Sequence, residues 1–296
     1  MDRINTTITR RRVTLLVGLM LAIVFCLEYL FSAEPVASIG PQRTVVLAGE
    51  TGSADPFETL IRHDPLAAMI EARAQHLRDV IDYECVMVKQ ELLPAGMSAE
   101  QEISVKFRQA PYSVYMEWKR NPGMAARVIY VKGRWTDSTA QDPEDRELAV
   151  AQPGALARIF VKSVTQPIHG RLAKKSSRRF IDEFGFEKTL DRLINICEMG
   201  KSRGELGLEY SGESQFDGRA VWVIRRHLPY IAEGGRYPDR TAEILIDQRL
   251  RVPVAVYCYS DDDRNPTNLL AKYEYRRVRM GVGLTEKDFE PVTYGM

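Results

Sequence analysis

Hydrophobic and polar residues follow four successive patterns along this chain. Residues 13–31 form an almost continuous apolar run, and residues 34–58 show no sustained period. Next comes a segment whose apolar residues recur at helical spacing, and most of the remaining chain alternates with a period of two. These patterns predict a membrane segment, a spacer and a domain built mainly of strands.

The apolar run from Val13 to Phe31 predicts a membrane segment. Arginines precede it at position 3 and at positions 10–12, so the positive-inside rule keeps the N-terminus in the cytoplasm and sends the rest across the membrane. Glu28 interrupts the run near its far end, where a carboxyl group can lie among the lipid headgroups. The run is therefore long enough for an anchor.

Signal-peptide cleavage is the alternative to an anchor. Small residues are preferred before a cleavage site, but Ala33 has Phe31 at the minus-three position and Ala37 has Pro35 there. We expect an uncleaved single-pass anchor in the inner (cytoplasmic) membrane, with the C-terminal domain in the periplasm or outside the cell. Secretion after signal-peptide cleavage is the alternative interpretation.

Two amphipathic helices are predicted beyond the spacer. The first begins with Asp64 as N-cap and Pro65 in the first helical position. The second runs from about Phe184 to Met199 and stops at Gly200. The apolar residues assigned to one face of the first helix are Leu66, Met69, Ile70, Leu77 and Ile81.

The period-two segments predict about nine strands. Short polar or glycine- and proline-containing links join them, which indicates antiparallel pairing. Residues 133–153 are acidic and broken, and predict a short strand or two around a loop. The expected strands are Tyr83–Leu93, Ile103–Gln109, Ser113–Trp118, Arg127–Lys132, Leu206–Ser211, Ala220–Arg226, Thr241–Asp247, Val254–Tyr259 and Leu269–Arg279.

A sheet of this size must curl, and two amphipathic helices suit its concave face. We therefore expect an α+β, mostly antiparallel fold, in which a strongly curved sheet, an incomplete barrel, wraps around the helices. The expected divisions are 1–32 for the cytoplasmic tip and membrane segment, 33–60 for a flexible linker and 61–296 for the domain. An apolar cavity of several hundred cubic ångströms is expected where the helices leave space.

Charge excludes a nucleic-acid binder. Removing the four arginines, Asp2 and Glu28 of the first 32 residues from the chain's 41 basic and 40 acidic residues leaves 37 against 38. The densest basic run, from Arg171 to Arg179, is short and lacks interleaved aromatic residues. We expect a solvated loop there and no nucleic acid among the partners.

Cysteine and histidine give little sign of catalysis. Cys85, Cys197 and Cys258 follow the membrane segment, and spacing alone does not decide which of them pair; a Cys85–Cys258 disulfide is one possibility. The chain lacks the common nucleophile, zinc-protease and phosphate-loop motifs. We expect no catalytic residue, metal site or cofactor. A Cys/His-dependent enzyme, with His227 or another of the four histidines, stays the least favoured function.

An acidic turn offers the one candidate for a cation. Asp261, Asp262, Asp263 and Asn265 supply oxygen ligands of the kind that calcium prefers, but the glycine of a tight calcium loop is missing. A polar hairpin turn is the favoured interpretation.

Aromatic and apolar strand residues are the candidate ligand contacts. Such residues also pack well in ordinary cores, and a one-residue slip in register exchanges the two faces of a strand. As a hypothesis, the concave lining includes Met116, Trp118, Tyr130, Trp222 and Ile244.

The order of motifs resembles the LolA-like lipoprotein-carrier superfamily, which includes LolA, LolB and RseB types. The tail reads AEILID, QRLRVP, VAVYCYS, LLAKYEYRRV and RMGVGLTEKDFEP. Upstream, DYECVMVKQEL, VKFRQAPYSVYMEW, RVIYVKG and GFEKTLDRLI resemble an uncharacterised bacterial envelope family, a domain of unknown function, within that superfamily. The resemblance covers about residues 65–290.

The resemblance implies a half-barrel whose concave apolar face accepts or senses acyl chains without doing chemistry. The membrane segment departs from the soluble carriers and disfavours free shuttling across the envelope. We expect a membrane-tethered protein that binds lipid or lipoprotein acyl chains. The alternative is a scaffold for an envelope protein partner with its cavity closed.

Overall fold

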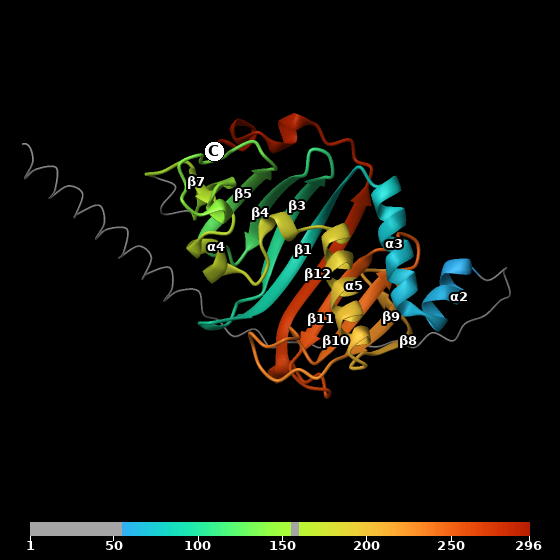
Figure 1. Ribbon diagram of the computed structural model, residues 1–296. Helices are drawn as coiled ribbons and strands as arrows, with labels where there is room; N and C mark the ends of the chain where they lie inside the picture. Colours follow the sequence, from blue (N-terminus) through green and yellow to red (C-terminus); the bar gives the residue numbers. More distant parts are fainter. Residues whose placement is uncertain (1–54, 155–159) are drawn as a thin grey trace, which may run out of the picture.

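The computed structural model describes residues 55–154 and 160–296 (Figure 1). The apolar run from Val13 to Phe31, most of the expected spacer and the N-terminal basic residues lie outside these ranges. Within them, no helix is both long and apolar enough to cross a bilayer.

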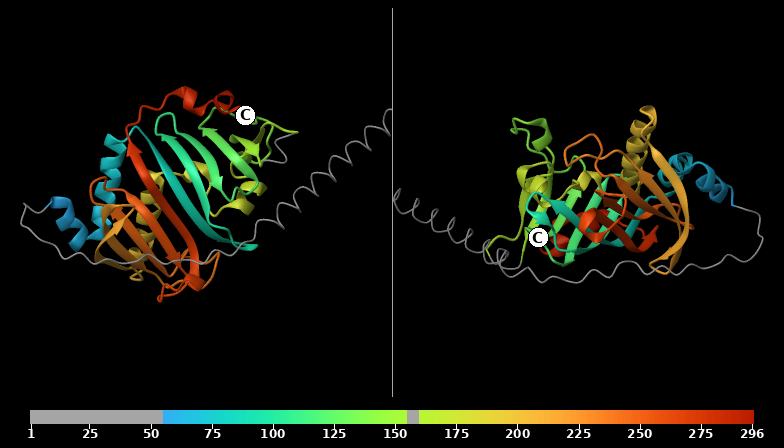
Figure 2. Two further views of the ribbon diagram at one scale, coloured as in Figure 1. Left: turned by 180° about the vertical axis from the view of Figure 1, so that it is seen from behind. Right: turned by 90° about the horizontal axis from the view of Figure 1, so that it is seen from below.

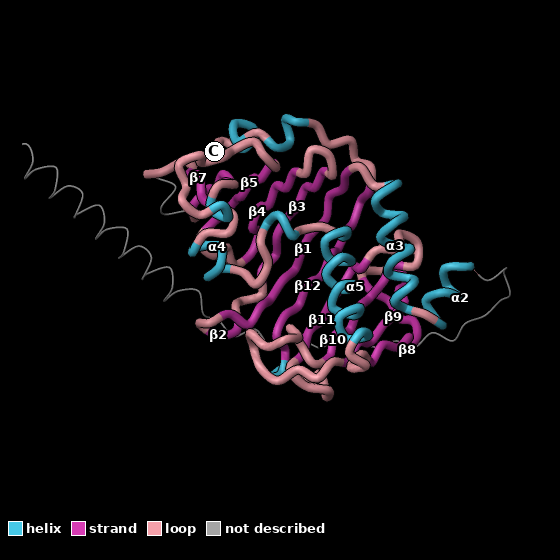
Figure 3. Tube along the Cα trace, in the orientation of Figure 1, coloured by secondary structure: helices cyan, strands magenta, loops and turns pink. Residues whose placement is uncertain are grey.

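One twelve-stranded sheet organises the described chain, and every strand pair in it is antiparallel. Figure 3 shows the strands of this sheet in magenta, side by side behind the helices. The strand order is β7-β6-β5-β4-β3-β1-β12-β11-β10-β9-β8, and β2 pairs only with β1. The strands are β1 Asp82–Leu93, β2 Gly96–Met97, β3 Gln101–Arg108, β4 Ser113–Arg120, β5 Ala125–Val131, β6 Leu148–Pro153, β7 Val164–Pro167, β8 Gly207–Phe216, β9 Arg219–His227, β10 Thr241–Asp247, β11 Pro253–Tyr259 and β12 Leu269–Met280.

The sheet is curved and open, with the first long strand and the last at its centre. β1 pairs with β12, so strands from the first half of the domain lie on one side of this pair and strands from the second half on the other. The view from below shows α5 on the inner side of the bent sheet (Figure 2). The expected fold class, a mostly antiparallel incomplete barrel around helices, is confirmed.

In the part of the chain that the structure describes, four α-helices accompany the sheet: α2 Pro56–His63, α3 Pro65–Asp79, α4 Arg171–Ser176 and α5 Phe186–Ser202. Asp64 caps α3 as expected, because its carboxylate accepts a hydrogen bond from the Ala67 N–H at 3.0 Å and Pro65 occupies the first turn. α3 packs against α5, and α2 packs against α3 and β8. The two predicted helices are therefore present as α3 and α5, but α5 continues through Gly200, which was expected to end it, to Ser202.

Two sequence-based expectations about the N-terminal part need correction. Residues 56–63 form α2, although the flexible linker was expected to reach residue 60; Asp55 caps this helix by accepting from the Phe57 N–H. On α3, Leu66 and Met69 are buried, whereas Ile70 and Leu77 are exposed, as is Ile81 just beyond the helix. Ile70 and Leu77 each follow a buried residue, Met69 and His76, by one position, which places them about 100° further round the helix, outside the side that enters the core.

The C-terminal segment covers part of the opposite, convex face. The Asp82 carboxylate accepts hydrogen bonds from three successive backbone N–H groups, those of Val282, Gly283 and Leu284, at 2.7 to 3.2 Å. Beyond this clamp, Phe289 of the short helix η5 (Glu286–Phe289) is fully buried. It forms a separate apolar cluster with Tyr115, Ile129 and Val131.

Candidate functional site

The inner face of the sheet, covered by the helices, is the candidate site. Register places the hypothesised lining residues on this face, because Met116 lies opposite Val105, Trp118 opposite Ile103 and Tyr130 opposite Val114. At the other side of the sheet, Trp222 lies opposite Ile246, and Ile244 is two residues before Ile246 on β10. All five residues, Met116, Trp118, Tyr130, Trp222 and Ile244, thus belong to one surface, and all except Trp118 are buried.

Four of these residues belong to or pack against the main apolar core, and the fifth does not. Met116, Trp222 and Ile244 are members of that core, and Trp118 packs against it. Trp222 also packs against Phe57 of α2, with ring centroids 5.3 Å apart. Tyr130 belongs to a separate cluster with Ala149 and Ile168. The structure therefore places four of the five hypothesised lining residues at the core that the helices cover, and Tyr130 outside it.

Aromatic side chains close the space between α5 and the centre of the sheet. The Phe186 ring lies 4.7 Å from the Tyr83 ring and 5.0 Å from the Tyr275 ring, measured between centroids. Tyr83 also stacks on Phe107 at 4.8 Å. Gly185, at the start of α5, has φ +114°, and a Cβ there would lie 3.2 Å from Phe107. The helix thus packs directly on the sheet.

A strap of residues 168–185 crosses the inner face between β7 and α5 (Figure 1). It contains α4 and the short helix η3 (Ile181–Glu183). The Tyr112 hydroxyl donates to the Phe184 carbonyl oxygen at 2.7 Å and lies 2.9 Å from that of Ile181. Burial raises the pKa of Tyr112 well above its ordinary value, so this hydroxyl keeps its proton. The hydroxyl of Tyr112, which immediately precedes β4, therefore ties the strap to the sheet.

Charged residues stand at both ends of one row across the inner face. Paired positions lead from Glu91 on β1 through Ala271, Cys258 and Ala242 to Arg226 on β9. We call these five residues the charged row. Both end residues are only 1% exposed, and buried charges require partners because removal from water is costly.

Glu91 is the centre of a hydrogen-bonded network that holds the strap. Its carboxylate accepts from Lys89 Nζ at 2.9 Å, from the Tyr273 hydroxyl at 2.7 Å, and from the Ser177 hydroxyl and Arg178 N–H at 3.0 and 3.1 Å. Burial raises the pKa of Glu91, but Lys89 and these hydrogen bonds outweigh it, so the pKa is lowered. The carboxylate is ionised at neutral pH.

Arg226 forms an ion pair with Asp239 at the other end of the charged row. Arg226 Nη2 lies 2.7 and 2.9 Å from the two oxygens of Asp239, and both residues are buried. Burial opposes the charge of Arg226, but Asp239 outweighs it and the pKa is raised. Nε and Nη1 of Arg226 have no hydrogen-bond partner among the described residues.

The sequence contains a signal for one end of the charged row. Tyr83, Cys85 and Met87 alternate inward on β1, so Lys89 and Glu91 continue the same face by parity. Charged residues at inward positions of a strand are unusual and indicate a buried network. Nothing comparable pointed to Asp239, which lies in a loop, thirteen residues beyond Arg226.

The candidate disulfide between Cys85 and Cys258 is absent, and all three described cysteines are free and buried. Cys258 pairs with Ala271, which in turn pairs with Glu91, six residues along β1 from Cys85. At about 3.3 Å per residue and about 4.8 Å between strands, the two cysteines are far beyond the roughly 7 Å Cα separation that a disulfide spans.

The cysteines are also poor nucleophiles. Burial raises the pKa of Cys85 far above its usual value and that of Cys258 to about 12, so both thiols stay protonated at neutral pH. A thiolate is the reactive form of cysteine. Neither residue is therefore poised for nucleophilic catalysis.

The four histidines occupy separate places in the described chain. His63 is exposed, and His76 is buried on α3 with its ring 5.9 Å from that of Phe186. His169 lies 3.0 Å from Asp182, and His227 lies 2.8 Å from Asp262. None of the four makes a hydrogen bond or ion pair with Cys85 in the structure.

The carboxylates of the acidic turn accept hydrogen bonds from other groups of the same turn. Asp263 accepts from the Asn265 N–H at 3.0 Å and from the Asn268 side chain at 2.8 Å, and Asp261 accepts from the Asp262 N–H. Across residues 55–154 and 160–296, no group of three or more acidic, histidine or cysteine side chains is placed to hold a metal ion. The arrangement is that of a polar hairpin turn.

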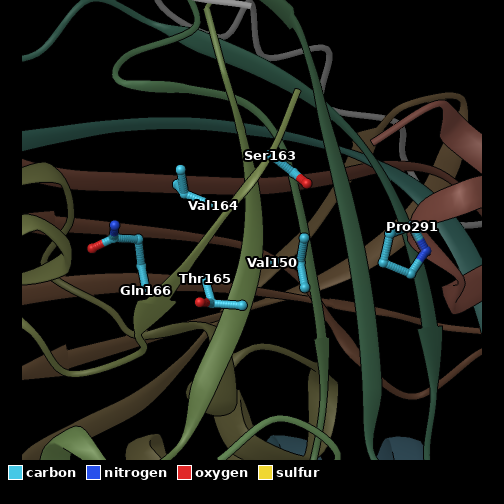
Figure 4. A pocket seen from close by; sticks show the side chains of 6 residues that line it. All are labelled: Val150, Ser163, Val164, Thr165, Gln166 and Pro291. Atoms are coloured by element: carbon cyan, nitrogen blue, oxygen red, sulfur yellow. The ribbon is translucent and has the colours of Figure 1, made fainter. Parts of the chain in front are cut away.

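A hollow of about 650 Å³ lies beside the edge strand β7 (Figure 4). It is open to solvent and has a mixed lining, with Thr165, Gln166 and Ser163 beside Val150, Val164 and Pro291. Its position differs from that of the expected apolar cavity beneath the helices. The difference arises because aromatic side chains of the strands and of α5 fill the space at the centre of the sheet.

Several solved structures resemble this chain at low sequence identity. The Pseudomonas aeruginosa MucA/MucB complex is 12% identical, with a TM-score of 0.40 over 76% of this chain and 60% of that chain. The Mycobacterium tuberculosis lipoprotein LppX is 10% identical, with a TM-score of 0.35 over 75% of this chain and 98% of that chain. A LolA superfamily protein from Nitrosomonas europaea is 9% identical, with a TM-score of 0.21 over 76% and 97%.

A crystal structure of MucB alone gives a TM-score of 0.42 at 12% identity, and the present chain spans 62% of its length. No curated protein matches the sequence. Residues 80–293 match the model of a family described as a protein of unknown function, DUF1571, which confirms the resemblance to an uncharacterised family. Because this match spans most of the chain, from the start of the sheet to the C-terminal segment, the protein belongs to the DUF1571 family.

Proposed function

We propose that the protein is a non-enzymatic scaffold of the cell envelope, tethered to the membrane by its N-terminal segment, which binds a protein partner through its outer surfaces. The observation that carries this proposal is the packing of α5 directly on the inner face. Phe186, Leu190 and Cys197 on the buried side of α5 are completely inaccessible to solvent. A partner therefore meets the edges, the helices and the convex face of the domain.

The side-chain chemistry supports a binding role. The buried thiols of Cys85 and Cys258 stay protonated, and the carboxylate of Glu91 is saturated by hydrogen bonds from the strap and the sheet. A catalytic centre needs a nucleophile or base that a substrate can reach. The buried charges instead fix the strap and the helix-covered face in one arrangement.

Acyl-chain binding is the second candidate, favoured by the way the strap is held. Glu91 and Tyr112 fasten it through hydrogen bonds, while the sheet that it crosses carries apolar residues such as Met116 and Tyr130. Release of these polar contacts and movement of the strap uncover apolar surface for a lipid. This function requires an open state that differs from the closed one described above.

Native mass spectrometry of a chain starting at residue 55 distinguishes the two candidates. Circular dichroism first establishes that this chain is folded. The scaffold predicts a protein mass without co-purifying lipid and no binding of a fluorescent fatty acid. A stoichiometric lipid adduct, together with saturable binding of the fatty acid, contradicts the closed scaffold and supports the second candidate.

A pair of matched variants locates any lipid that binds. Trp118→Arg places a charge on the inner face, whereas Ile231→Arg places one at a loop residue that is 93% exposed. Binding at the inner face is lost in the first variant and kept in the second. Equal binding by both variants assigns the fatty acid to another surface and leaves the inner face closed.

A further inference from the structure

Helix α3 carries an unpartnered apolar stripe on the side that faces away from the sheet. Ala67, Ile70, Ala74 and Leu77 are spaced three and four residues apart, and Ile81 follows just beyond the helix end. Ile70 is 44% exposed, Leu77 38% and Ile81 71%. We call these five residues the outer stripe. The opposite side of α3, with Met69, Ala72 and His76, is buried in the core.

The spacing of the outer stripe is that of a short coiled-coil seam. Alternate steps of three and four residues put its helical members on one narrow face, and such faces pair with another helix. Small residues, Ala67 and Ala74, alternate with large ones, Ile70 and Leu77. Small residues at alternate positions allow two helix backbones to approach closely. In the described structure α3 contacts α2, α5 and β8, while Ile70, Leu77 and Ile81 of the outer stripe remain exposed and Ala67 and Ala74 are half-buried.

The charges beside the outer stripe are self-complementary. Glu71 and Arg78 follow Ile70 and Leu77 directly, so both flank the same side of the stripe, and they are 52% and 60% exposed. A two-fold axis near Ala74 sets Ile70 against Leu77 of a second antiparallel copy and Glu71 against Arg78 of that copy. Each contact then occurs twice, as an isologous interface requires.

The contact between Glu71 and Arg78 within one chain is loose enough for both side chains to form an ion pair with a second copy. The closest approach between Arg78 Nη2 and Glu71 Oε1 is 3.6 Å, and both side chains are more than half exposed. Exposed ion pairs of this kind contribute little to stability. The two residues therefore exchange an internal partner for an external one at small cost.

We infer that the outer stripe of α3 is a self-association surface, on which α3 of a second copy of this chain lies antiparallel with Ala74 at the two-fold axis. A single helix pair of this length is smaller than a standard interface, which buries about 800 Å² per partner. The association is accordingly weak for a free domain. Confinement of two tethered chains to one membrane raises their effective concentration and strengthens it.

Cross-linking of the full-length chain in lipid vesicles tests this arrangement. Cys26→Ser removes the cysteine outside the described residues, and the three described cysteines are buried and free. In that background Ala74→Cys brings two thiols together at the axis, so mild oxidation yields a disulfide-linked dimer. Ser202→Cys, at an exposed position near the end of α5, is the matched control and yields at least fivefold less dimer.

Charge reversal gives the sharper readout. With Ala74→Cys present, E71R makes both flanking charges positive and R78E makes both negative, so each variant alone repels its own copy. Cross-linking falls at least threefold in each variant and returns to the starting level when the two are mixed. A merely structural role of Glu71 or Arg78 does not produce recovery on mixing.

Two outcomes overturn the inference. Equal dimer yields from the Ala74→Cys and Ser202→Cys chains show that collision alone forms the disulfide. Charge-reversed variants that cross-link as well alone as when mixed show that Glu71 and Arg78 do not face each other across copies. Circular dichroism of each variant checks that the exposed substitutions leave the fold intact.

Discussion

At the scale of single residues, the domain depends on a few charged groups in an otherwise apolar face. Lys89 and Glu91 are two residues apart on β1, both point inward and both are buried. The pair is stable because Tyr273 and Ser177 complete the hydrogen bonds of the carboxylate. Removal of one charged member of such a pair is costly, because the other charge then stays buried without a partner.

Glu91→Gln tests this dependence. The substitution keeps the side-chain shape but leaves the Lys89 ammonium without its counter-charge, and we expect a loss of about 3–5 kcal/mol in the free energy of unfolding, measured with urea. Tyr273→Phe removes one hydrogen bond and keeps the ion pair, so its loss is smaller, about 1.5–3 kcal/mol. Equal losses from the two variants contradict a stabilising role for the Lys89–Glu91 pair.

His76 makes the stability of the domain sensitive to acid. Burial lowers its pKa to about 4, and neither ring nitrogen has a hydrogen-bond partner among the described residues. Between pH 6.5 and 4 the unfolded chain binds a proton that the folded chain excludes, so stability falls as the pH falls through this window. At pH 4.5 this difference in proton binding lowers the free energy of unfolding by about 2–3 kcal/mol relative to neutral pH.

His76→Leu is expected to remove this acid-dependent loss of stability. The free energy of unfolding of the variant is expected to fall less than that of the wild type between pH 7 and pH 4.5, by about 2–3 kcal/mol, because leucine binds no proton. Urea titrations at the two pH values measure it. His63→Leu, at an exposed position, serves as control. The explanation fails if the wild type and both variants share one pH dependence.

At the scale of elements, α5 is fitted closely to the loop that follows β9. A Cβ on Gly200 would lie 2.7 Å from Leu228 Cδ2 and 3.3 Å from Leu206 Cβ, and Leu228 is completely buried. Alanine is the better helix former by about 1 kcal/mol. Overpacking in a well-packed core typically costs about 1–3 kcal/mol, so the two effects oppose each other.

Gly200→Ala is expected to destabilise the domain by about 1–2 kcal/mol, because the clash with Leu228 exceeds the gain in helix propensity. Thermal unfolding followed by circular dichroism at 222 nm gives the change in Tm. Lys201→Ala, at the exposed neighbouring position, provides the control and leaves Tm nearly unchanged. An increased Tm for the glycine variant indicates that Leu228 moves aside freely.

The long elements were predictable from sequence because each repeats its pattern several times. The strand expected at Thr241–Asp247 has these bounds in β10, and α3 begins where Asp64 and Pro65 indicate. Shorter elements depend on contacts distant in sequence. The four residues of β7 pair only with β6, and although Val164 and Thr165 favour strands, two such residues are too short a run to predict one.

The candidate site was predictable only in part. Alternation indicated that Met116 and Trp118 share a face, and the structure places both on the inner face. Whether that face is hollow depends on how α5 packs, which a single sequence does not encode in any local pattern. Arg226 and Asp239 meet because a loop folds back over the sheet, so no local sequence pattern predicts their ion pair.

At the scale of the whole molecule, the C-terminal segment acts as a cover for the convex face. Phe289 is completely buried against Ile129, and the Arg108 guanidinium lies 5.1 Å from the centroid of its ring. The Tyr294 ring stacks on Tyr115 at 3.9 Å. These contacts join the last residues of the chain to β4 and β5, near the opposite side of the sheet from β8.

A chain that ends at Leu284 is expected to keep its sheet but to expose the apolar cluster around Tyr115 and Ile129. An apolar dye such as anilinonaphthalene sulfonate then binds with increased fluorescence, and Tm falls, because a buried aromatic anchor such as Phe289 contributes about 3–5 kcal/mol. Val292→Ala in the full chain, at a residue that is 80% exposed, is the control and binds no additional dye. Unchanged fluorescence of the shortened chain contradicts the covering role.

The adjacency of β1 and β12 has a consequence for how the protein is made. The two strands at the centre of the sheet are separated by nearly the whole sequence of the domain, with Met87 opposite Tyr275. A chain that emerges gradually from a ribosome or a membrane channel gains its central pairing only after β12 has emerged, long after β1. Contacts of such long range slow folding. The edge of β1 that pairs with β12 therefore stays open in the nascent chain until β12 is made, and an open strand edge is a surface on which chains aggregate.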